Sequence, residues 1–285
     1  MSKYGDFMNN IGIIGLGYVG TALKEGFKDF YNIETYDLVP NLSTCNSIEQ
    51  LINKVDIIFV CVPTPMNNDG SSNIDIVKST IKDISGSQNT INKIIVIKST
   101  VPPGTTKSLN NKYSNLDIFF NPEFLTEANF IQDFKNQDRI ILGGSQESVS
   151  ILVKVYEKVF PNATIIETES NYAEMVKYLS NTFLATKVSF ANEMKMICDK
   201  LDIDYDKIIE YATYDDRLGK SHWSVPGPDG KLGFGGSCFP KDINALISVA
   251  IDMDLDPKII KSAWDVNLKV RPEKDWEKLQ GRAVT

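Results

Sequence analysis

Histidine and cysteine are both scarce in this sequence. His222 is the only histidine among 285 residues, so a triad that uses histidine as its base would depend on that one position. The four cysteines, Cys45, Cys61, Cys198 and Cys238, are scattered and form no C-x-x-C pair. This spacing argues against a zinc site and against a disulfide framework, and we expect no bound metal.

Long apolar runs and an excess of positive charge are missing as well. The longest apolar runs, such as residues 55–62, are far shorter than the ~20 residues of a membrane helix. Met1–Asn10 is polar and lacks the apolar core of a signal peptide. The formal net charge is −7, whereas nucleic acids and anionic membranes bind basic surfaces. We therefore expect a cytoplasmic protein that has neither of them as its partner.

The first part of the chain shows the pattern of an α/β domain. Seven short apolar runs alternate with segments of helical period, and continuous apolar strands between helices predict a doubly wound, Rossmann-like parallel sheet covered on both faces. We expect this domain over residues 1–168. The runs are Ile11–Ile14, Ile33–Asp37, Asp56–Cys61, Ile94–Lys98, Ile118–Asn121, Arg139–Leu142 and Thr164–Ile166.

The strand pattern stops near residue 169. Apolar residues at helical spacing predict a long helix over Asn171–Lys200 and three shorter helices over Tyr205–Tyr211, Ile243–Ile251 and Pro257–Val270. We expect a mostly α-helical second domain over residues 169–271. A long Gly- and Pro-rich loop, Thr213–Pro240, interrupts it, and a polar tail over 272–285 follows that we expect to be loosely packed.

A glycine motif of the form G-x-G-x-x-G follows the first predicted strand and opens a helix. Such a turn lets the backbone and the helix N-terminus approach a pyrophosphate. A carboxylate that ends the second strand, at an offset of ~20 residues, binds the ribose 2′-hydroxyl and repels a 2′-phosphate. The pattern therefore predicts NAD as the cofactor. The expected contacts are Gly15, Gly17, Tyr18, Val19, Gly20 and Asp37.

Other candidate chemistry lies at strand ends and at one helix start. Turns at the carboxyl ends of parallel strands are where open α/β sheets bind ligands, and Thr64 and Thr100 lie in two such turns. Cys238 lies just before a helix start with Lys241 close by, and both features lower the pKa of a thiol. Each residue also fits an ordinary loop or packing role. The residues alone therefore predict an NAD-binding α/β protein with one candidate nucleophile.

Seven strings in order along the chain carry a resemblance to a known family. They span nearly the whole sequence, and the ordered set resembles the nucleotide-sugar 6-dehydrogenases of the UDP-glucose/GDP-mannose dehydrogenase family. The strings are IGLGYVG from Ile14, VPTP from Val62, KSTVP from Lys98, NPEFL from Asn121, Lys177-x-x-x-Asn181-Thr182, DRLG from Asp216 and GFGGSCFPKD from Gly233.

The resemblance implies an oxidoreductase that converts a sugar C6 alcohol to a carboxylate in two NAD-dependent hydride transfers. We expect UDP-glucose as substrate, with GDP-mannose or a UDP-N-acetylhexosamine as alternatives. The implied roles are Cys238 as nucleophile of a thiohemiacetal and thioester, Lys177 with Asn181 as oxyanion stabilisers, and Glu123, Thr100 and Asp242 around the water. Thr64, Thr100, Glu127 and Lys241 would contact NAD, and Glu123, Phe124, Leu125, Lys177, Asn181, Arg217 and Gly235 the sugar nucleotide.

The sequence departs from the family pattern in two places. Family members normally continue into a third, C-terminal α/β domain that supplies much of the nucleotide-binding surface, and residues 218–234 look lengthened around Pro226–Gly230. Either a separate chain supplies the third domain or the substrate binds with fewer contacts. We also expect a second copy as partner, bound through the amphipathic segments Asn171–Lys200 and Pro257–Val270 of the helical domain. Two alternatives stay open: a non-catalytic NAD-binding module, and a two-electron relative of the 6-phosphogluconate or hydroxyacid dehydrogenase type.

Overall fold

The computed structural model describes residues 9–285, except for the side chains of residues 146–148, so most of the polar N-terminus lies outside the described part. The chain divides into two compact units. The first comprises the residues up to Thr64 together with Ile74–Lys177, and the second comprises Pro65–Asn73 and Tyr178–Thr285. The division thus falls after Lys177 rather than after residue 168, and the short internal segment Pro65–Asn73 belongs to the second unit.

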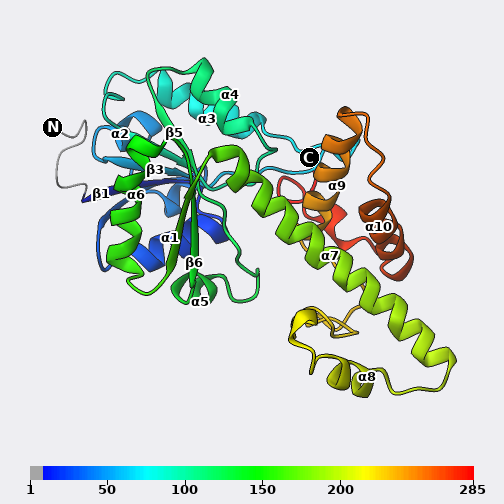
Figure 1. Cartoon of the computed structure of the whole chain (residues 1–285). Helices are drawn as coiled ribbons and strands as arrows, with labels where there is room; N and C mark the ends of the chain where they lie inside the picture. The colour runs from blue at the N-terminus through cyan, green and yellow to red at the C-terminus, as the bar shows by residue number, and fades with distance from the viewer. Residues whose placement is uncertain (1–8) are drawn as a thin grey trace. The chain divides into compact units, whose positions relative to one another are not determined.

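The first unit is a seven-stranded sheet with helices on both faces (Figure 1). This confirms the predicted Rossmann-like architecture, in which the strand order reverses between β1 and β3. The strands in spatial order are β2 (Asn32–Tyr36), β1 (Asn10–Ile14), β3 (Ile57–Val60), β4 (Ile94–Ile97), β5 (Asp117–Phe120), β6 (Arg139–Gly143) and β7 (Thr164–Thr168). The helices are α1 (Tyr18–Phe27), η1 (Pro40–Leu42), α2 (Ile48–Ile52), α3 (Asp75–Ser85), α4 (Thr105–Lys112), α5 (Phe130–Lys135) and α6 (Gln146–Val159).

Alternate residues of each central strand enter two separate cores, because successive side chains of a strand point to opposite faces. In β3, Ile57 and Phe59 pack in the core that also holds Phe27 of α1. Ile58 and Val60 join the other core, on the side of α2, α3 and α4. All four strand residues are fully buried. The continuous apolar runs of the sequence are therefore strands covered on both faces.

The prediction of a wholly parallel sheet is wrong at one pair of strands. β5 and β6 pair antiparallel through Phe120 and Gly143, whereas β6 and β7 are parallel to each other. The chain enters β6 at the same edge of the sheet at which it leaves β5. An apolar run buried on both faces has the same composition in either direction, so the sequence carried no signal for this reversal.

The second unit is helical. It contains α7 (Ser170–Lys200) from Tyr178 onward, α8 (Tyr205–Ala212), η2 (Asp216–Leu218), α9 (Cys238–Asp252), α10 (Lys258–Val270) and η3 (Asp275–Lys278). α9 begins at Cys238 rather than at the predicted Ile243, because Pro240 lies in its first turn, where a missing N–H breaks no helical bond. Among the described residues, no helix combines the length and apolarity that a membrane crossing requires.

The tail over residues 272–285 is packed, so the prediction of a loose tail is wrong. Trp276 and Ala283 are each 1% exposed, and the Trp276 ring lies 5.1 Å from that of Trp264. The Met66 N–H donates to the Ala283 carbonyl at 2.8 Å, and the Thr285 N–H donates to the Met66 carbonyl at 3.0 Å. The polar composition of the tail concealed one large buried side chain and a backbone pairing that side chains do not encode.

Candidate functional site

The glycine motif forms a turn between β1 and α1 that only small residues allow. Gly15 has a φ of +90°, and a Cβ on Gly20 would lie 1.9 Å from the Gly15 carbonyl oxygen. A Cβ on Gly17 would meet nothing within 4 Å, and no side chain caps α1. The turn therefore leaves open space at a helix N-terminus, where a pyrophosphate can approach the backbone. Tyr18 is partly exposed, and Val19 packs on the core below.

Asp37 lies beside this turn, directly after β2. Its Oδ2 accepts the Leu16 N–H at 2.6 Å, and its Oδ1 accepts the Val39 N–H at 2.8 Å. The two bonds fix the carboxylate next to the glycine motif while it stays partly exposed. This position suits an acceptor for ribose hydroxyls, and the residues present therefore fit NAD.

Two further predicted turns lie together at the carboxyl edge of the sheet. The Ser99 hydroxyl, after β4, donates to the Val62 carbonyl after β3 at 2.6 Å. Thr64 and Thr100 are buried in these turns, with 5% and 6% of their surface exposed. The two threonines thus lie in turns that follow the carboxyl ends of strands, as predicted, and the two strands are neighbours in the sheet. Glu127 lies half-buried farther along the same unit, after Leu125.

Glu123 and Lys177 form a buried ion pair that the sequence did not reveal. Lys177 Nζ lies 3.0 Å from Glu123 Oε1, and the two side chains are 2% and 8% exposed. Glu123 Oε2 accepts the Leu125 N–H at 2.7 Å, and Lys177 Nζ lies 5.4 Å from the centre of the Phe124 ring. A charge in such a dry site interacts strongly with any charge that develops nearby. The lysine and the carboxylate are therefore fixed against each other in a site from which water is largely excluded.

Lys98 is a second buried lysine near this pair, and sequence reasoning had given it no role. Its Nζ donates to Asn121 Oδ1 at 2.6 Å, and the Tyr156 hydroxyl donates to the same oxygen. Burial lowers the pKa of Lys98 to about 8, although the charge of Glu123 acts in the opposite direction. The sequence signal for a buried lysine was its position at the end of the apolar run Ile94–Lys98.

A cavity of about 500 Å³ opens beside Glu123. Phe124 and Leu125, two predicted substrate contacts, line it together with Lys98. Arg139, which no motif had marked, also lines the cavity and stacks over the Phe124 ring at 4.3 Å. The first unit thus offers a cavity of ligand size next to its buried ion pair.

The second unit holds the candidate nucleophile. Cys238 is half-buried at the first position of α9, and Asp242 follows one turn later, 1% exposed. Asn181 Nδ2 donates to Asp242 Oδ2 at 2.5 Å, and Lys241 Nζ lies 2.5 Å from Asp242 Oδ1. Asn181 of α7 and Lys241 of α9 therefore both contact Asp242, in the first turns of the helix that begins at Cys238. Helix N-termini favour the thiolate form of cysteine.

Two predicted substrate contacts have different surroundings. Arg217 is 89% exposed and forms a forked ion pair with Asp215, two residues earlier in the chain. Gly235 lies against the buried Arg271 guanidinium, where a Cβ would come within 2.4 Å of Nη2. In the part of the chain that the structure describes, no group of three or more His, Cys, Asp or Glu side chains is arranged to hold a metal ion.

Comparison with known proteins gives matches over both units. Residues 33–160 match the NAD-binding domain of the UDP-glucose/GDP-mannose dehydrogenase family, and residues 171–269 match its central domain. UDP-glucose 6-dehydrogenase TuaD of Bacillus subtilis is 33% identical over 93% of this chain and 64% of its own length. UDP-glucose 6-dehydrogenase of Rickettsia bellii is 40% identical over 79% of this chain and 51% of its own.

A solved structure agrees with these matches. A UDP-glucose dehydrogenase from Pyrobaculum islandicum superposes with a TM-score of 0.83 at 30% identity, over 97% of this chain and 71% of that protein. The chain spans between about half and two thirds of the length of the two curated relatives named above.

Proposed function

Because the chain belongs to the UDP-glucose/GDP-mannose dehydrogenase family, we propose that it oxidises the C6 alcohol of a nucleotide sugar to the carboxylate, with NAD as hydride acceptor and UDP-glucose as substrate. The observation that carries this proposal is the placement of Cys238 at the start of α9, one turn before the buried, hydrogen-bonded Asp242. A two-electron relative of the 6-phosphogluconate or hydroxyacid dehydrogenase type needs no cysteine nucleophile and would leave this arrangement without a purpose.

The reaction proceeds in two oxidations. In the first, the C6 alcohol would give a hydride to bound NAD and a proton, through water, to a carboxylate, for which Glu123 and Asp242 are the candidates, and an aldehyde would result. The Cys238 thiolate adds to the aldehyde carbon and gives a thiohemiacetal. Loss of a second hydride to another NAD gives the thioester. Water then cleaves the C–S bond, which yields the carboxylate and returns the thiolate.

Lys177 and Asn181 serve the charged stages of this sequence. Lys177 carries a positive charge in a site that is 2% exposed, so it stabilises an oxygen that becomes negative when the thiolate adds or water attacks. Its present partner is Glu123 at 3.0 Å. The positive charge of Lys177 is therefore shared between the Glu123 carboxylate and the developing oxyanion. Asn181 holds Asp242 at 2.5 Å and keeps the second carboxylate in place.

NADH formation with a limiting, known amount of UDP-glucose tests the proposal. We expect two NADH for each UDP-glucose consumed. One NADH per sugar would contradict the thioester route and favour simple alcohol oxidation. A chain that binds NAD but forms no NADH with UDP-glucose, GDP-mannose or UDP-N-acetylhexosamines would instead be the non-catalytic module.

A cytoplasmic location remains our prediction from the sequence.

We also infer a homodimer formed through the helical unit. Leu179, Phe183, Phe190, Ile197 and Leu201 follow one another at intervals of four or seven residues along α7 and its C-terminal end. These spacings place them on one face of a helix. All five are exposed, from 46% to 65%, and an apolar stripe of this length marks an interaction surface. Light scattering checks the inference, and a monomer at micromolar concentration would contradict it.

A further inference from the structure

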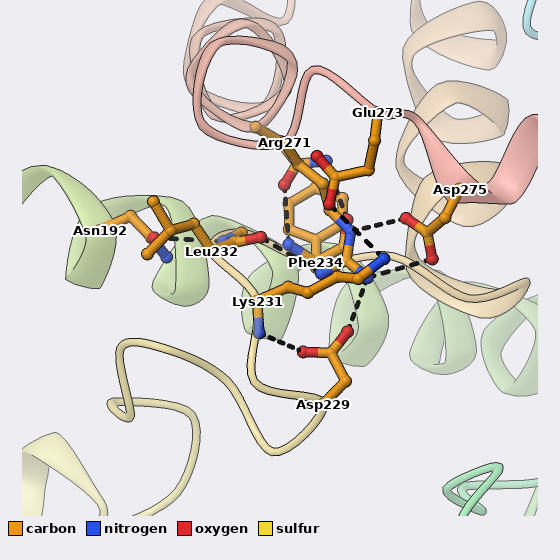
Figure 2. Close-up of polar contacts among 10 residues, drawn as sticks. Asn192, Asp229, Lys231, Leu232, Phe234, Arg271, Glu273 and Asp275 are labelled. Atoms are coloured by element: carbon orange, nitrogen blue, oxygen red, sulfur yellow. Dashed lines mark hydrogen bonds and ion pairs between the residues drawn. The ribbon is translucent and has the colours of Figure 1, made fainter.

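Arg271 is a buried cation in the second unit, at the end of α10 (Figure 2). Its side chain is 2% exposed and contacts two carboxylates. Nε lies 2.6 Å from Asp275 Oδ1, and Nη2 lies 2.6 Å from Asp229 Oδ2. Nη1 donates to the Leu232 carbonyl at 3.2 Å. All three nitrogens of the guanidinium are therefore engaged, which a lysine with its single nitrogen cannot reproduce.

The partners of Arg271 surround the glycine loop Gly233–Gly236 that precedes Cys238. Leu232 is the residue before this loop, and Gly235 lies flat against the guanidinium, so that a Cβ would come within 2.6 Å of three of its atoms. Asp275 also accepts a backbone hydrogen bond from Gly236. Arg271 thus contacts Leu232, just before the loop, and Gly235, its third residue. Asp275 bonds to Gly236, its last residue.

The same loop is fixed at its beginning by two asparagines. Asn192 Oδ1 accepts the Gly233 N–H at 3.1 Å, and Asn267 both accepts from and donates to the Phe234 backbone, at 2.7 and 3.0 Å. Phe234 packs against Trp264, which in turn packs against Trp276 of the tail. Contacts from α7, α10 and the tail therefore all converge on this loop.

The electrostatics of the cluster agree with its geometry. Hydrogen bonds from Arg271 hold the pKa values of Asp275 and Asp229 below their usual range, although burial opposes this for both groups. A buried guanidinium without such partners would be strongly unfavourable. Asp229 belongs to the segment that looks lengthened relative to the family pattern. This segment therefore supplies one of the two anions that let the cation be buried.

We propose that Arg271 and Asp275 are positioning residues, which fix the glycine loop and through it the Cys238 sulfur, and that Asp229 completes their cluster. Three glycines in four residues have many backbone conformations available, so the loop does not hold a single shape by itself. A catalytic nucleophile must lie within roughly 0.5 Å of its productive position. The cluster supplies this constraint. The proposal rests on the assignment of Cys238 as nucleophile, but its test does not need turnover.

The rate of alkylation of Cys238 by iodoacetamide measures how firmly the loop is held. At about pH 10 an ordinary thiol is ionised, so that the rate reports access to the sulfur. Trypsin releases Cys238 within Leu232–Lys241 and Cys198 within Met196–Lys200, and mass spectrometry follows the two peptides separately. Cys198 lies on α7, so it serves as an internal reference in the same molecule.

We expect Arg271→Lys and Asp275→Asn to speed alkylation of Cys238 at least about threefold, because local opening of the loop exposes the sulfur, and to leave Cys198 unchanged. Asp229→Asn, on a side chain that is 47% exposed, tests the same cluster with little risk to folding and should have a smaller effect of the same sign. Glu273→Gln is the matched control, because it breaks the neighbouring 3.5 Å ion pair with Lys231. It should change neither rate.

Unchanged alkylation of Cys238 in folded Asp275→Asn and Asp229→Asn would overturn the proposal. So would an equal increase for Cys198, since that would show a general loss of stability. Where turnover is measurable, kcat should fall in Arg271→Lys and Asp275→Asn while the KM for NAD stays constant. Absence of turnover in the unmodified protein would contradict the proposed function but would not affect the alkylation result.

Discussion

Phe27 of the first unit and Phe183 of the second show how differently the two units are stabilised. Phe27 is fully buried, and five aromatic rings have their centres within 6.4 Å of its own. Phe183 is 65% exposed on α7. The two large cores of the first unit cover both faces of its sheet. The second unit has two small clusters, of four and three buried residues among those described.

Polar contacts take a larger part where the apolar core is small. In the second unit, Arg271 with its two carboxylates and the asparagines on Gly233 and Phe234 hold backbone that no strand or helix holds. The first unit has the features of a domain that folds on its own, whereas the second retains apolar surface that a partner would cover. The candidate chemistry is also divided between the units, because the glycine motif lies in one unit and the candidate nucleophile in the other.

Cys238→Ser should have the largest effect and would test this division of the chemistry. We expect turnover to fall at least about 10³-fold, because a serine hydroxyl is a far weaker nucleophile than a thiolate at neutral pH. NAD affinity, measured by calorimetry, should not change, since Cys238 is not among the expected NAD contacts, all of which except Lys241 lie in the first unit. Cys198→Ser is the matched control and should retain full activity. Two NADH per sugar from Cys238→Ser would contradict the assignment.

Phe27→Ala and Phe183→Ala compare the two surroundings directly. The loss of a fully buried ring typically lowers the free energy of unfolding by about 3–5 kcal/mol. An exposed position changes it by less than about 0.5 kcal/mol. Urea denaturation at protein concentrations below those of self-association measures both. Equal losses for the two variants would show that the helical unit buries Phe183 after all, and the contrast between the units would then disappear.

The architecture of the first unit could be predicted from the sequence because its strands are short, apolar and separated by helices. Their number, the helices between them and the glycine turn followed from that pattern, and the family matches confirm the fold. The direction of β6 did not follow, because Ile140 and Ile141 would be buried equally well in a parallel strand. The packed tail did not follow either, since it depends on Trp276 and on backbone pairing with Met66.

The candidate site could be predicted only in part, for a similar reason. Motif spacing marked Glu123, Lys177 and Cys238, but it did not show that Glu123 and Lys177 are paired at 3.0 Å. Lys98 and Arg271 lie at the ends of a predicted strand and a predicted helix, where a cation gives no hint of burial. Their significance depends on partners that are distant in the sequence, such as Asn121 and Asp229.

Asp37→Ala should have an intermediate effect, confined to the first unit. Loss of hydrogen bonds between the carboxylate and the ribose should weaken NAD binding by about 1–3 kcal/mol. Asp37 also accepts the Leu16 N–H at 2.6 Å, so thermal unfolding must show that the variant is folded. Asp37→Asn keeps one acceptor and removes the charge that repels a 2′-phosphate, and it should lower the preference for NAD over NADP. Unchanged NAD affinity in Asp37→Ala would show that the strand-end assignment is wrong.

Lys98→Met should have the smallest effect. It would test whether the stability of the first unit changes in a different pH range from that of the second. Burial lowers the pKa of Lys98 to about 8, against about 10.4 in an unfolded chain. Between these values the unfolded state binds more protons, so the free energy of unfolding rises with pH, by on the order of 1 kcal/mol from about pH 7 to about pH 9. In the second unit the lowered pKa values of Asp229 and Asp275 act at the other end of the scale, since the stability they contribute is lost as the pH falls through their folded values.

The measurement for Lys98 is the difference in unfolding free energy between the unmodified chain and Lys98→Met across this pH range. Burial also raises the pKa of Cys61 to about 12, which lowers stability in alkali, but both proteins contain Cys61 and the difference largely cancels its contribution. The unmodified chain should gain stability relative to the variant as the pH rises. A constant difference would mean that Lys98 keeps its ordinary pKa and that the first unit tolerates a buried charge through its hydrogen bond to Asn121.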